Sequence, residues 1–296
     1  MNRIKKQLYN NPVGVGKFTG LLLILPFIIG FLIFTLYPFV SSLYHGLTIS
    51  YNGKLGLDHF IKIFKDPSVR KAAGVTLKYA AVLVPLKLIV SLLTAMLLNL
   101  EIKGIGIFRT VFYIPSILGA NLSVVIMWQF LFTSDGLINQ LISSLGIAPV
   151  HWYSNANSAL SIIILLRLWE FGSTMVIFLA ALRDIPKDYY DAASIDGCGK
   201  IRAFFKITVP LIKNVIFVNL ILQTISALQE FNAPYMITGG NPMKGTYTIG
   251  MLIYDEMFSF SNPNYANAVS WILFIFIAII IFLMYRLTGC LREDKK

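Results

Sequence analysis

Long apolar runs recur along the whole chain and decide which folds are open to it. A helix that crosses a hydrocarbon core of about 30 Å needs roughly 20 consecutive, mostly apolar residues. Of the 296 residues, 56% are apolar and only 13% carry a charge, a composition that favours a membrane protein over a soluble domain. The sequence therefore predicts an all-α, polytopic membrane protein.

Six of the runs are long enough to span a membrane. Lipid offers the backbone no hydrogen-bonding partner, so each span is expected to be a helix. The expected spans are residues 18–43, 74–98, 110–132, 159–182, 211–236 and 265–287. Pro26 and Pro38 predict kinks in the first of them. The chain is thus divided into an N-terminal tail (1–17), a six-helix transmembrane domain (18–287) and a C-terminal tail (288–296).

The distribution of Lys and Arg predicts which side of the membrane each loop faces. With six spans both tails share a side, and fifteen basic residues then lie on that side against six on the other. Because basic residues accumulate in cytoplasmic loops, both tails are expected in the cytoplasm. The stretch LDHFIKIFKDP, residues 57–67, places its lysines outside instead. Its Phe60, Ile63 and Phe64 fall on one helical face, which predicts an amphipathic helix at the outer interface.

Several kinds of partner and site are not expected. The net charge of +11 follows from this topology, and the chain has no stripe of basic and aromatic residues suited to nucleic acid. Its three histidines are scattered, without cysteines or carboxylates at ligand spacing, so no metal site is expected. Cys198 and Cys290 both fall on the cytoplasmic side, where free thiols are expected in preference to a disulfide.

A polar interruption occupies the longest expected cytoplasmic loop, residues 183–209. The sequence DAASIDGCGKIRAFFKITVPLI (191–212) indicates a short helix, a glycine bend and a second helix that returns to the bilayer. Asp188 and Asp191 stand near the start of the first helix, where negative charge suits the helix dipole. The second helix is expected to turn its basic residues to water and to have an apolar face. That face comprises Ile201, Phe204, Phe205 and Thr208.

The interruption resembles the cytoplasmic hallmark of the membrane subunits of ATP-binding-cassette (ABC) importers that work with an external binding protein. That hallmark is Glu-Ala-Ala, three residues, Gly, nine residues and Ile-x-Leu-Pro. The chain has Asp-Ala-Ala at 191–193, Gly197, and Ile-Thr-Val-Pro at 207–210. Asp replaces Glu and Val replaces Leu, and both changes are mild.

Three further stretches are similar to the carbohydrate branch of that family. They are ALRDIPKDYYDAASIDG at 181–197, ALQEFNAPYMITGGNPMKGTYTIGMLIYDEMF at 227–258, and GLIN at 136–139. The resemblance covers nearly the whole chain. It implies the type I ABC importer permease fold and the transport of a sugar, with an oligosaccharide or a glycerol-phosphate-like ligand expected. The maltose permeases of the family are expected to carry a large external insertion that this chain lacks, so maltose itself is not implied.

The resemblance also implies partners in a bacterial plasma membrane. They are a second homologous permease, two cytoplasmic ABC ATPase subunits and an extracellular solute-binding protein. The loop at 183–209 would then dock on the ATPase. The residues assigned to that contact are Asp191, Ala192, Ala193, Asp196, Gly197 and Lys200. The chain has no Walker A pattern, so ATP and Mg²⁺ are expected on the partner ATPase, with no cofactor and no catalytic residue in this chain.

Polar residues within the spans indicate a path for the sugar, because they are costly in lipid and usually face a cavity or another helix. Arg167 and Glu170 are three residues apart and can form a pair along the helix. Sugars offer hydroxyls to amides and carboxylates, and C–H faces to aromatic rings. The residues expected to line the path are Trp169, Glu170 and Ser173 in the fourth span and Gln223, Ser226 and Glu230 in the fifth.

Other interpretations remain open at this point. The polar interruption could be a simple loop helix ended by a glycine, and the polar residues of the spans could only bind neighbouring helices or the partner permease. The main alternative function is an ion-coupled secondary transporter that uses Arg167, Glu170 or Glu230 as its ion site. Such transporters are often built from internal repeats, and the sequence has no clear one. A membrane-bound enzyme is a weaker alternative, since no cluster of catalytic residue types stands at an aqueous face.

Overall fold

The structure is a computed structural model that describes residues 17–49, 54–100, 102–119 and 121–288. These residues are built almost entirely from helices. The α-helices are α2 (Lys17–Phe31), α3 (Tyr37–Leu47), α4 (Asp58–Lys65), α5 (Pro67–Leu98), α6 (Ile105–Leu118), α7 (Leu122–Leu131), α8 (Leu137–Ser144), α9 (Ala156–Trp169), α10 (Gly172–Arg183), α11 (Asp188–Ile195), α12 (Lys200–Ala203), α13 (Val209–Leu211), α14 (Lys213–Leu228), α15 (Asn232–Thr238), α16 (Ile249–Tyr254) and α17 (Pro263–Thr288). Three π-helical turns, η1 (Leu32–Leu36), η2 (Phe204–Thr208) and η3 (Asp255–Ser259), interrupt them. The all-α expectation is confirmed.

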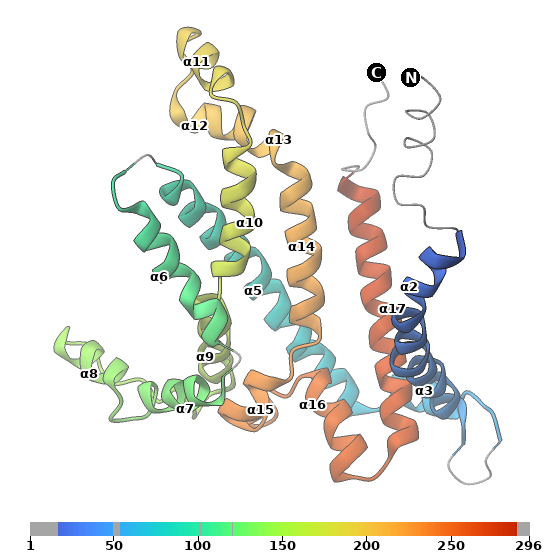
Figure 1. The fold of residues 1–296 in the computed structure, drawn as a ribbon. Helices are drawn as coiled ribbons and strands as arrows, with labels where there is room; N and C mark the ends of the chain where they lie inside the picture. Colours follow the sequence, from blue (N-terminus) through green and yellow to red (C-terminus); the bar gives the residue numbers. More distant parts are fainter. Residues whose placement is uncertain (1–16, 50–53, 101, 120, 289–296) are drawn as a thin grey trace, which may run out of the picture.

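The long helices run side by side, with short helices at both ends of the bundle (Figure 1). Helix α5 packs against α10 and α14, and α3 packs against α17. One end carries α11 and α12, together with the α5–α6 connection, the start of α2 and the end of α17. The other end carries α7, α8, α15 and α16. The described ends of the chain therefore share a side with the 183–209 loop, as predicted.

Three stretches of the described residues are individually long and apolar enough to cross a membrane: Leu22–Leu47, Pro67–Leu98 and Pro263–Arg286. Three bent pairs satisfy the same criterion together: α6 with α7, α9 with α10, and Lys200–Leu211 with α14. If each pair is one span, the chain has up to six, in line with the predicted number. The predicted tails, 1–17 and 288–296, and Cys290 lie almost wholly outside the described residues.

Two spans end earlier than the apolar pattern predicts. The third was expected as one helix over 110–132, but α6 ends at Leu118 and α7 is a separate helix at 100° to it. The side chain of Asn121 accepts a hydrogen bond from the Ser123 amide and so starts α7. The fifth was expected to reach residue 236, but α14 ends at Leu228. There Glu230 accepts a hydrogen bond from the Ala233 amide and begins α15.

Irregular turns also mark the other spans. The first span contains the π-helical turn η1 immediately before Pro38. Because proline has no N–H to continue an α-helical ladder, the irregular turn falls one turn earlier. Pro26 lies inside α2. The fourth span bends by 43° between α9 and α10.

The second span begins at a well-formed cap. Asp66 accepts a hydrogen bond of 2.8 Å from the Ser68 amide, and Pro67 occupies the first turn. The Tyr265 hydroxyl of α17 donates to the same carboxylate at 2.7 Å, so Asp66 also joins two spans. Partial burial acts to raise the pKa of Asp66, but the bonds from Tyr265, Ser68 and Val69 outweigh it and hold that pKa below its ordinary value.

The amphipathic segment forms the expected helix, α4, but its apolar residues do not share one environment. Ile63 is 3% exposed and packs in a cluster with residues of α16 and α17, including Tyr265. Phe60 packs against the same cluster. Phe64, expected on the same face, is 81% exposed. The next residue in a helix is turned by about 100°, so only one edge of α4 reaches the bundle.

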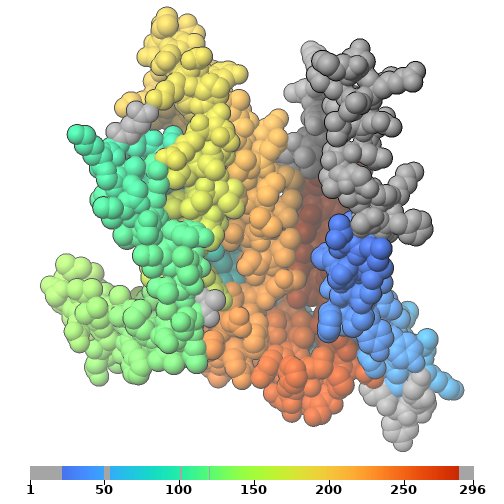
Figure 2. All heavy atoms as spheres, in the orientation of Figure 1, coloured from blue at the N-terminus to red at the C-terminus, as the bar shows by residue number. Residues whose placement is uncertain are grey.

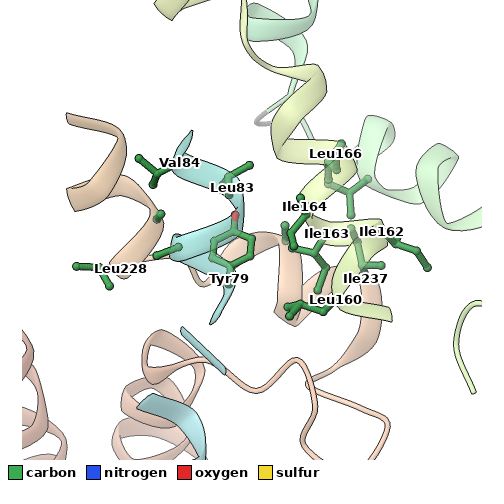
Figure 3. Packing of buried hydrophobic residues seen from close by; sticks show 14 of the residues in the cluster. Tyr79, Leu83, Val84, Leu160, Ile162, Ile163, Ile164, Leu166, Leu228 and Ile237 are labelled. Carbon is green, nitrogen blue, oxygen red and sulfur yellow. The ribbon is translucent and has the colours of Figure 1, made fainter. Parts of the chain in front are cut away.

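The largest buried cluster lies where α5, α9, α14 and α15 meet. In Figure 3 the ring of Tyr79 lies between Leu228 of α14 and the isoleucines of α9. Tyr79, Ile162 and Ile163 are fully buried. Since buried apolar side chains of this kind stabilise a fold by about 1.5–3 kcal/mol each, this cluster fixes α9 against α5 and α14. Helices α5, α9 and α14 also carry polar residues of the spans.

Candidate functional site

An open, polar cavity of about 350 Å³ lies between α5, α9 and α14 and the segment that follows α14. Most residues of its wall are polar or charged, which is unusual at the level of membrane-spanning helices. The polar and charged residues of the wall are Tyr79, Lys87, Arg167, Glu170, Gln223, Ser226, Gln229, Glu230 and Asn232. The wall contains two cations, Lys87 and Arg167, and two carboxylates, Glu170 and Glu230, so its formal charges cancel.

Arg167 is the centre of the charged network. Its Nε and Nη2 donate to the two oxygens of Glu230 at 2.8 and 2.9 Å, a bidentate pair. Its Nη1 donates to both oxygens of Glu170 at 3.0 and 2.9 Å. The predicted pairing of Arg167 with Glu170 is therefore confirmed. The stronger partner, Glu230, comes from the next span and is only 8% exposed.

Neighbouring groups fix the positions of the Glu230 and Glu170 side chains. The Tyr79 hydroxyl donates to Glu230 at 3.4 Å, and the Ala233 amide donates to it at 3.1 Å. A Cβ atom added at Gly119 would overlap the side chain of Glu170. Glycine at the end of α6 thus leaves the space that the Glu170 side chain occupies.

The structure brings together four of the six residues expected to line a path. Glu170, Gln223, Ser226 and Glu230 all line the cavity. Trp169 does not: its ring lies 5.8 Å from that of Trp128 and packs in the buried cluster. Neither does Ser173, an exposed residue whose amide donates to the Ser116 hydroxyl. Successive residues of α9 point in different directions, so Trp169 and Glu170 cannot face the same space.

The aromatic rings near the cavity come from other residues. Phe231 lines the cavity, and its ring lies 5.0 Å from Tyr235 and 4.9 Å from Tyr254. Tyr254 in turn lies 5.0 Å from Phe258, an exposed residue. These four residues, which we name the aromatic ladder, extend from the cavity wall to the surface. In the sequence, all four lie within the stretch 227–258 that resembles the carbohydrate branch, but its pattern does not bring them together.

At the opposite end of the bundle, α11 and α12 form a hairpin that projects from the molecule (Figure 2). Helix α11 ends at Ile195, and Gly197, two residues later, has a φ of +72°. The Cys198 amide donates to the Ala193 carbonyl at 2.8 Å, the bond that closes a helix with a left-handed residue. A Cβ atom at Gly197 or Gly199 would meet nothing within 4 Å. Gly197 is thus required by the backbone turn, and both glycines face open space.

The residues expected to contact a partner lie on this hairpin, and all but one of them are exposed. Ala193 is half-buried; the exposed residues are Asp191, Ala192, Asp196, Gly197 and Lys200. The hairpin is also tied to the start of the fifth span, because the hydroxyls of Tyr190 and Thr208 lie 2.8 Å apart. A displacement of α11 would therefore reach η2, the turn that leads through α13 into α14, by a direct contact as well as through the chain.

The expected apolar face of the second hairpin helix is wrong in two residues. Ala203 and Thr208 are buried, but Ile201 is 78% exposed and Phe205 is 65% exposed. The π-helical turn η2 covers Phe204–Thr208 and changes the angular spacing that an α-helix would give. Ile201 and Phe205 line the same open hollow as Gly197, and Ile195 of α11 is 88% exposed. Exposed apolar side chains of this kind mark a contact with another protein.

The described residues contain no group of three or more His, Cys, Asp or Glu side chains that could hold a metal ion. Cys198, the one cysteine within that part of the chain, is free.

Comparisons with known proteins place the chain among transport proteins. The family model described as "Binding-protein-dependent transport system inner membrane component" matches residues 104–294. The probable ABC transporter permease protein YesP of Bacillus subtilis is 41% identical over 90% of this chain and 89% of its own length. The trehalose/maltose transport system permease protein MalF of Thermococcus litoralis is 32% identical, over 93% of this chain and 95% of its own length. That permease has no room for a large insertion, so the expected difference from maltose permeases does not hold for it.

A solved structure has the same fold. A chain in the crystal structure of a bacterial alginate ABC transporter, in complex with an alginate pentasaccharide-bound periplasmic protein, superimposes with a TM-score of 0.79. The match covers 97% of both chains at 22% identity. The predicted importer-permease fold is therefore confirmed.

Proposed function

Because the chain belongs to the family of binding-protein-dependent transport system inner membrane components, we propose that it is a membrane subunit of an ATP-driven importer whose substrate is an oligosaccharide. The curated relatives that it matches along most of its length support this function over an ion-coupled transporter. The observation that carries the proposal is the exposed hairpin α11–α12 with the Asp-Ala-Ala and Gly197 pattern.

In this proposal a cytoplasmic ATPase binds the hairpin and moves the membrane helices through that contact. The apolar surface of the hairpin, made of Ile195, Ile201 and Phe205, fits into a groove of the ATPase. Asp191 and Lys200 stand at its edge as charged contacts. ATP and Mg²⁺ bind to the ATPase, and this chain supplies the coupling contact and no catalytic residue.

The polar cavity is proposed as this chain's half of the sugar path. Gln223, Ser226 and Asn232 offer neutral donors and acceptors to sugar hydroxyls, while Phe231 and the rest of the aromatic ladder offer faces for C–H groups. The charges of Arg167, Glu170 and Glu230 largely bind one another, so an uncharged sugar meets little unpaired charge. Trp169 is replaced in this role by the ladder.

The complete importer has further parts in this proposal. A second homologous permease faces the polar cavity and closes it, two ATPase subunits lie in the cytoplasm, and a solute-binding protein delivers the sugar from outside. The hairpin end, with both tails, faces the cytoplasm of a bacterial cell; the excess of basic residues on that end supports this orientation.

Reconstitution in liposomes tests the proposed function. The chain is purified with its sister permease and ATPase, and uptake of sugars delivered by the binding protein is followed with ATP inside or outside the liposomes. Uptake that requires ATP on the hairpin side supports the proposal. Sugar uptake by the chain alone, driven by a pH or sodium gradient, would contradict the proposed function.

A variant separates coupling from insertion. Gly197→Arg places a long side chain at the open turn and is expected to abolish copurification with the ATPase while leaving the chain in the membrane. Gly146→Arg introduces the same side chain at another exposed glycine with a positive φ, +78°, and open space around it, after α8 at the opposite end of the bundle, and serves as the control. Normal copurification of Gly197→Arg with the ATPase would contradict the docking assignment.

A further inference from the structure

A second cavity, apolar and about 300 Å³ in volume, lies away from the sugar path. It is lined by α4, the first turns of α5, the end of α14, the start of α16 and the first half of α17. Both α5 and α17 begin at the end of the bundle opposite the hairpin (Figure 1). Its apolar wall includes Val69, Leu77, Leu228, Ile249, Leu273 and Phe276. Neither the Arg167 network nor the aromatic ladder contributes to it.

Only two residues of the wall carry polar side-chain groups, and one of these is already satisfied. The Thr76 hydroxyl donates to the Ala72 carbonyl and accepts from the Ile249 amide, both at 2.9 Å. The other residue is Arg70, which is exposed. Among the described residues, the guanidinium of Arg70 forms no ion pair with a carboxylate. The acidic residue one turn earlier, Asp66, is already held by Tyr265 and Ser68.

The cavity has a charged end and an apolar end. Arg70 lies in the first turn of α5, whereas Leu77 lies seven residues deeper, or roughly 10 Å along the helix. On α17 the wall likewise runs from Val269 inward to Phe276. The axis of the cavity is thus parallel to the spans, with its cation at the membrane surface and its apolar depth within the hydrocarbon region.

The basic residues around the mouth fit this arrangement. Lys62 and Lys65 of α4 and Lys71 of α5 are within eight residues of Arg70 in the sequence, on the side where the distribution of charge predicts few basic residues. Clusters of Lys and Arg at a membrane surface attract anionic headgroups, at about 1 kcal/mol for each residue. A guanidinium also binds a phosphate with two parallel hydrogen bonds, which an ammonium cannot do.

We propose that this cavity binds an anionic phospholipid from the outer leaflet of the plasma membrane. The phosphate pairs with Arg70, and one acyl chain occupies the space between α5 and α17. The lipid fills a gap that the protein leaves open between α4, α16 and α17, and it gives the basic segment 62–71 a function that topology alone does not explain.

Lipid binding to the intact importer tests this inference. The purified complex, in detergent micelles, is titrated with palmitoyl-oleoyl-phosphatidylglycerol or with palmitoyl-oleoyl-phosphatidylcholine, and bound lipid is counted by native mass spectrometry. We expect the anionic phosphatidylglycerol to bind about fivefold more tightly than the zwitterionic phosphatidylcholine. This ratio corresponds to about 1 kcal/mol. Equal binding of the two lipids would overturn the proposal.

Four variants locate the site. Arg70→Gln is expected to abolish the preference, and Arg70→Lys to retain only part of it. Lys71→Gln removes the same charge from a neighbour that does not line the cavity and is expected to reduce the preference by less than Arg70→Gln does. Ala73→Leu, which fills the cavity from α5, is expected to weaken binding of both lipids.

Three results would contradict the site. They are an equal effect of Arg70→Gln and Lys71→Gln, unchanged binding to Ala73→Leu, and a cross-link from a cysteine at Phe64 to a helix of the sister permease in place of lipid.

Discussion

The Arg167 network makes a quantitative prediction for Glu230→Gln. The substitution removes one of two carboxylates that neutralise Arg167, and it replaces a bidentate pair at 2.8 and 2.9 Å with at most one hydrogen bond. Breaking a buried ion pair costs about 3–5 kcal/mol. Because Glu170 still binds Arg167 with both oxygens, we expect a loss near the lower end, about 3 kcal/mol.

Arg167→Met should cost more, about 5 kcal/mol, because Glu170 and Glu230 then lose their shared partner and only Lys87 opposes them. The double variant leaves one carboxylate opposite Lys87 and restores a balanced charge. Its loss should therefore be smaller than the sum of the two single losses, with a coupling energy of about 2 kcal/mol.

Equilibrium unfolding of the full chain in mixed micelles, followed by tryptophan fluorescence, measures these free energies. Asp135→Asn changes an exposed carboxylate and serves as the matched control, with an expected change within about 0.5 kcal/mol. If the losses of Arg167→Met and Glu230→Gln add to within about 0.5 kcal/mol, the two residues do not form the pair on which the cavity wall depends.

Three further predictions concern other parts of the chain. Gly197→Ala should destabilise the hairpin by about 1–2 kcal/mol because φ is +72° there. Gly199→Ala, at φ −66°, should not destabilise it. Amide exchange rates in α11 measure the difference, and equal effects of the two variants would contradict the assigned turn. Tyr254→Ala should raise the KM of sugar uptake, while Trp169→Ala should lower thermal stability and leave KM unchanged; the reverse pattern would remove the aromatic ladder from the path. Since its folded-state pKa is lowered, Asp66 contributes stability that is present above about pH 3.9 and is lost as the pH falls through that lowered pKa. The stability advantage of wild type over Asp66→Asn should therefore shrink in acid, and an advantage that is independent of pH down to about 2 would refute this.

The sequence predicts the spans well because apolar length is a local property. It does not predict where spans break, since the breaks depend on contacts between distant residues. The fifth span stops because Glu230 turns to cap α15 and to bind Arg167, 63 residues earlier in the chain. The third stops where Gly119 makes room for Glu170. Neither partner can be identified from the apolar pattern of one helix.

The site was predictable in part for the same reason. Spacing along one helix correctly paired Arg167 with Glu170 and gathered Gln223, Ser226 and Glu230 on one face. Spacing did not predict the position of Trp169, because an aromatic ring in a span can face either a cavity or the core. The ring of Trp169 packs against that of Trp128, on a different helix, and so faces the core. Spacing failed again for Ile201, because a π-helical turn leaves no mark in the apolar pattern.

Site-specific photocross-linking tests most directly whether the hairpin is the contact with a nucleotide-hydrolysing subunit. A photoreactive residue is placed at Ile201 on the hairpin or at Phe258 on the opposite end, both exposed apolar positions. In native membranes, position 201 should cross-link to a cytoplasmic ATPase and position 258 should not. Cross-links to an ATPase from position 258, or from neither position, would contradict the proposed coupling.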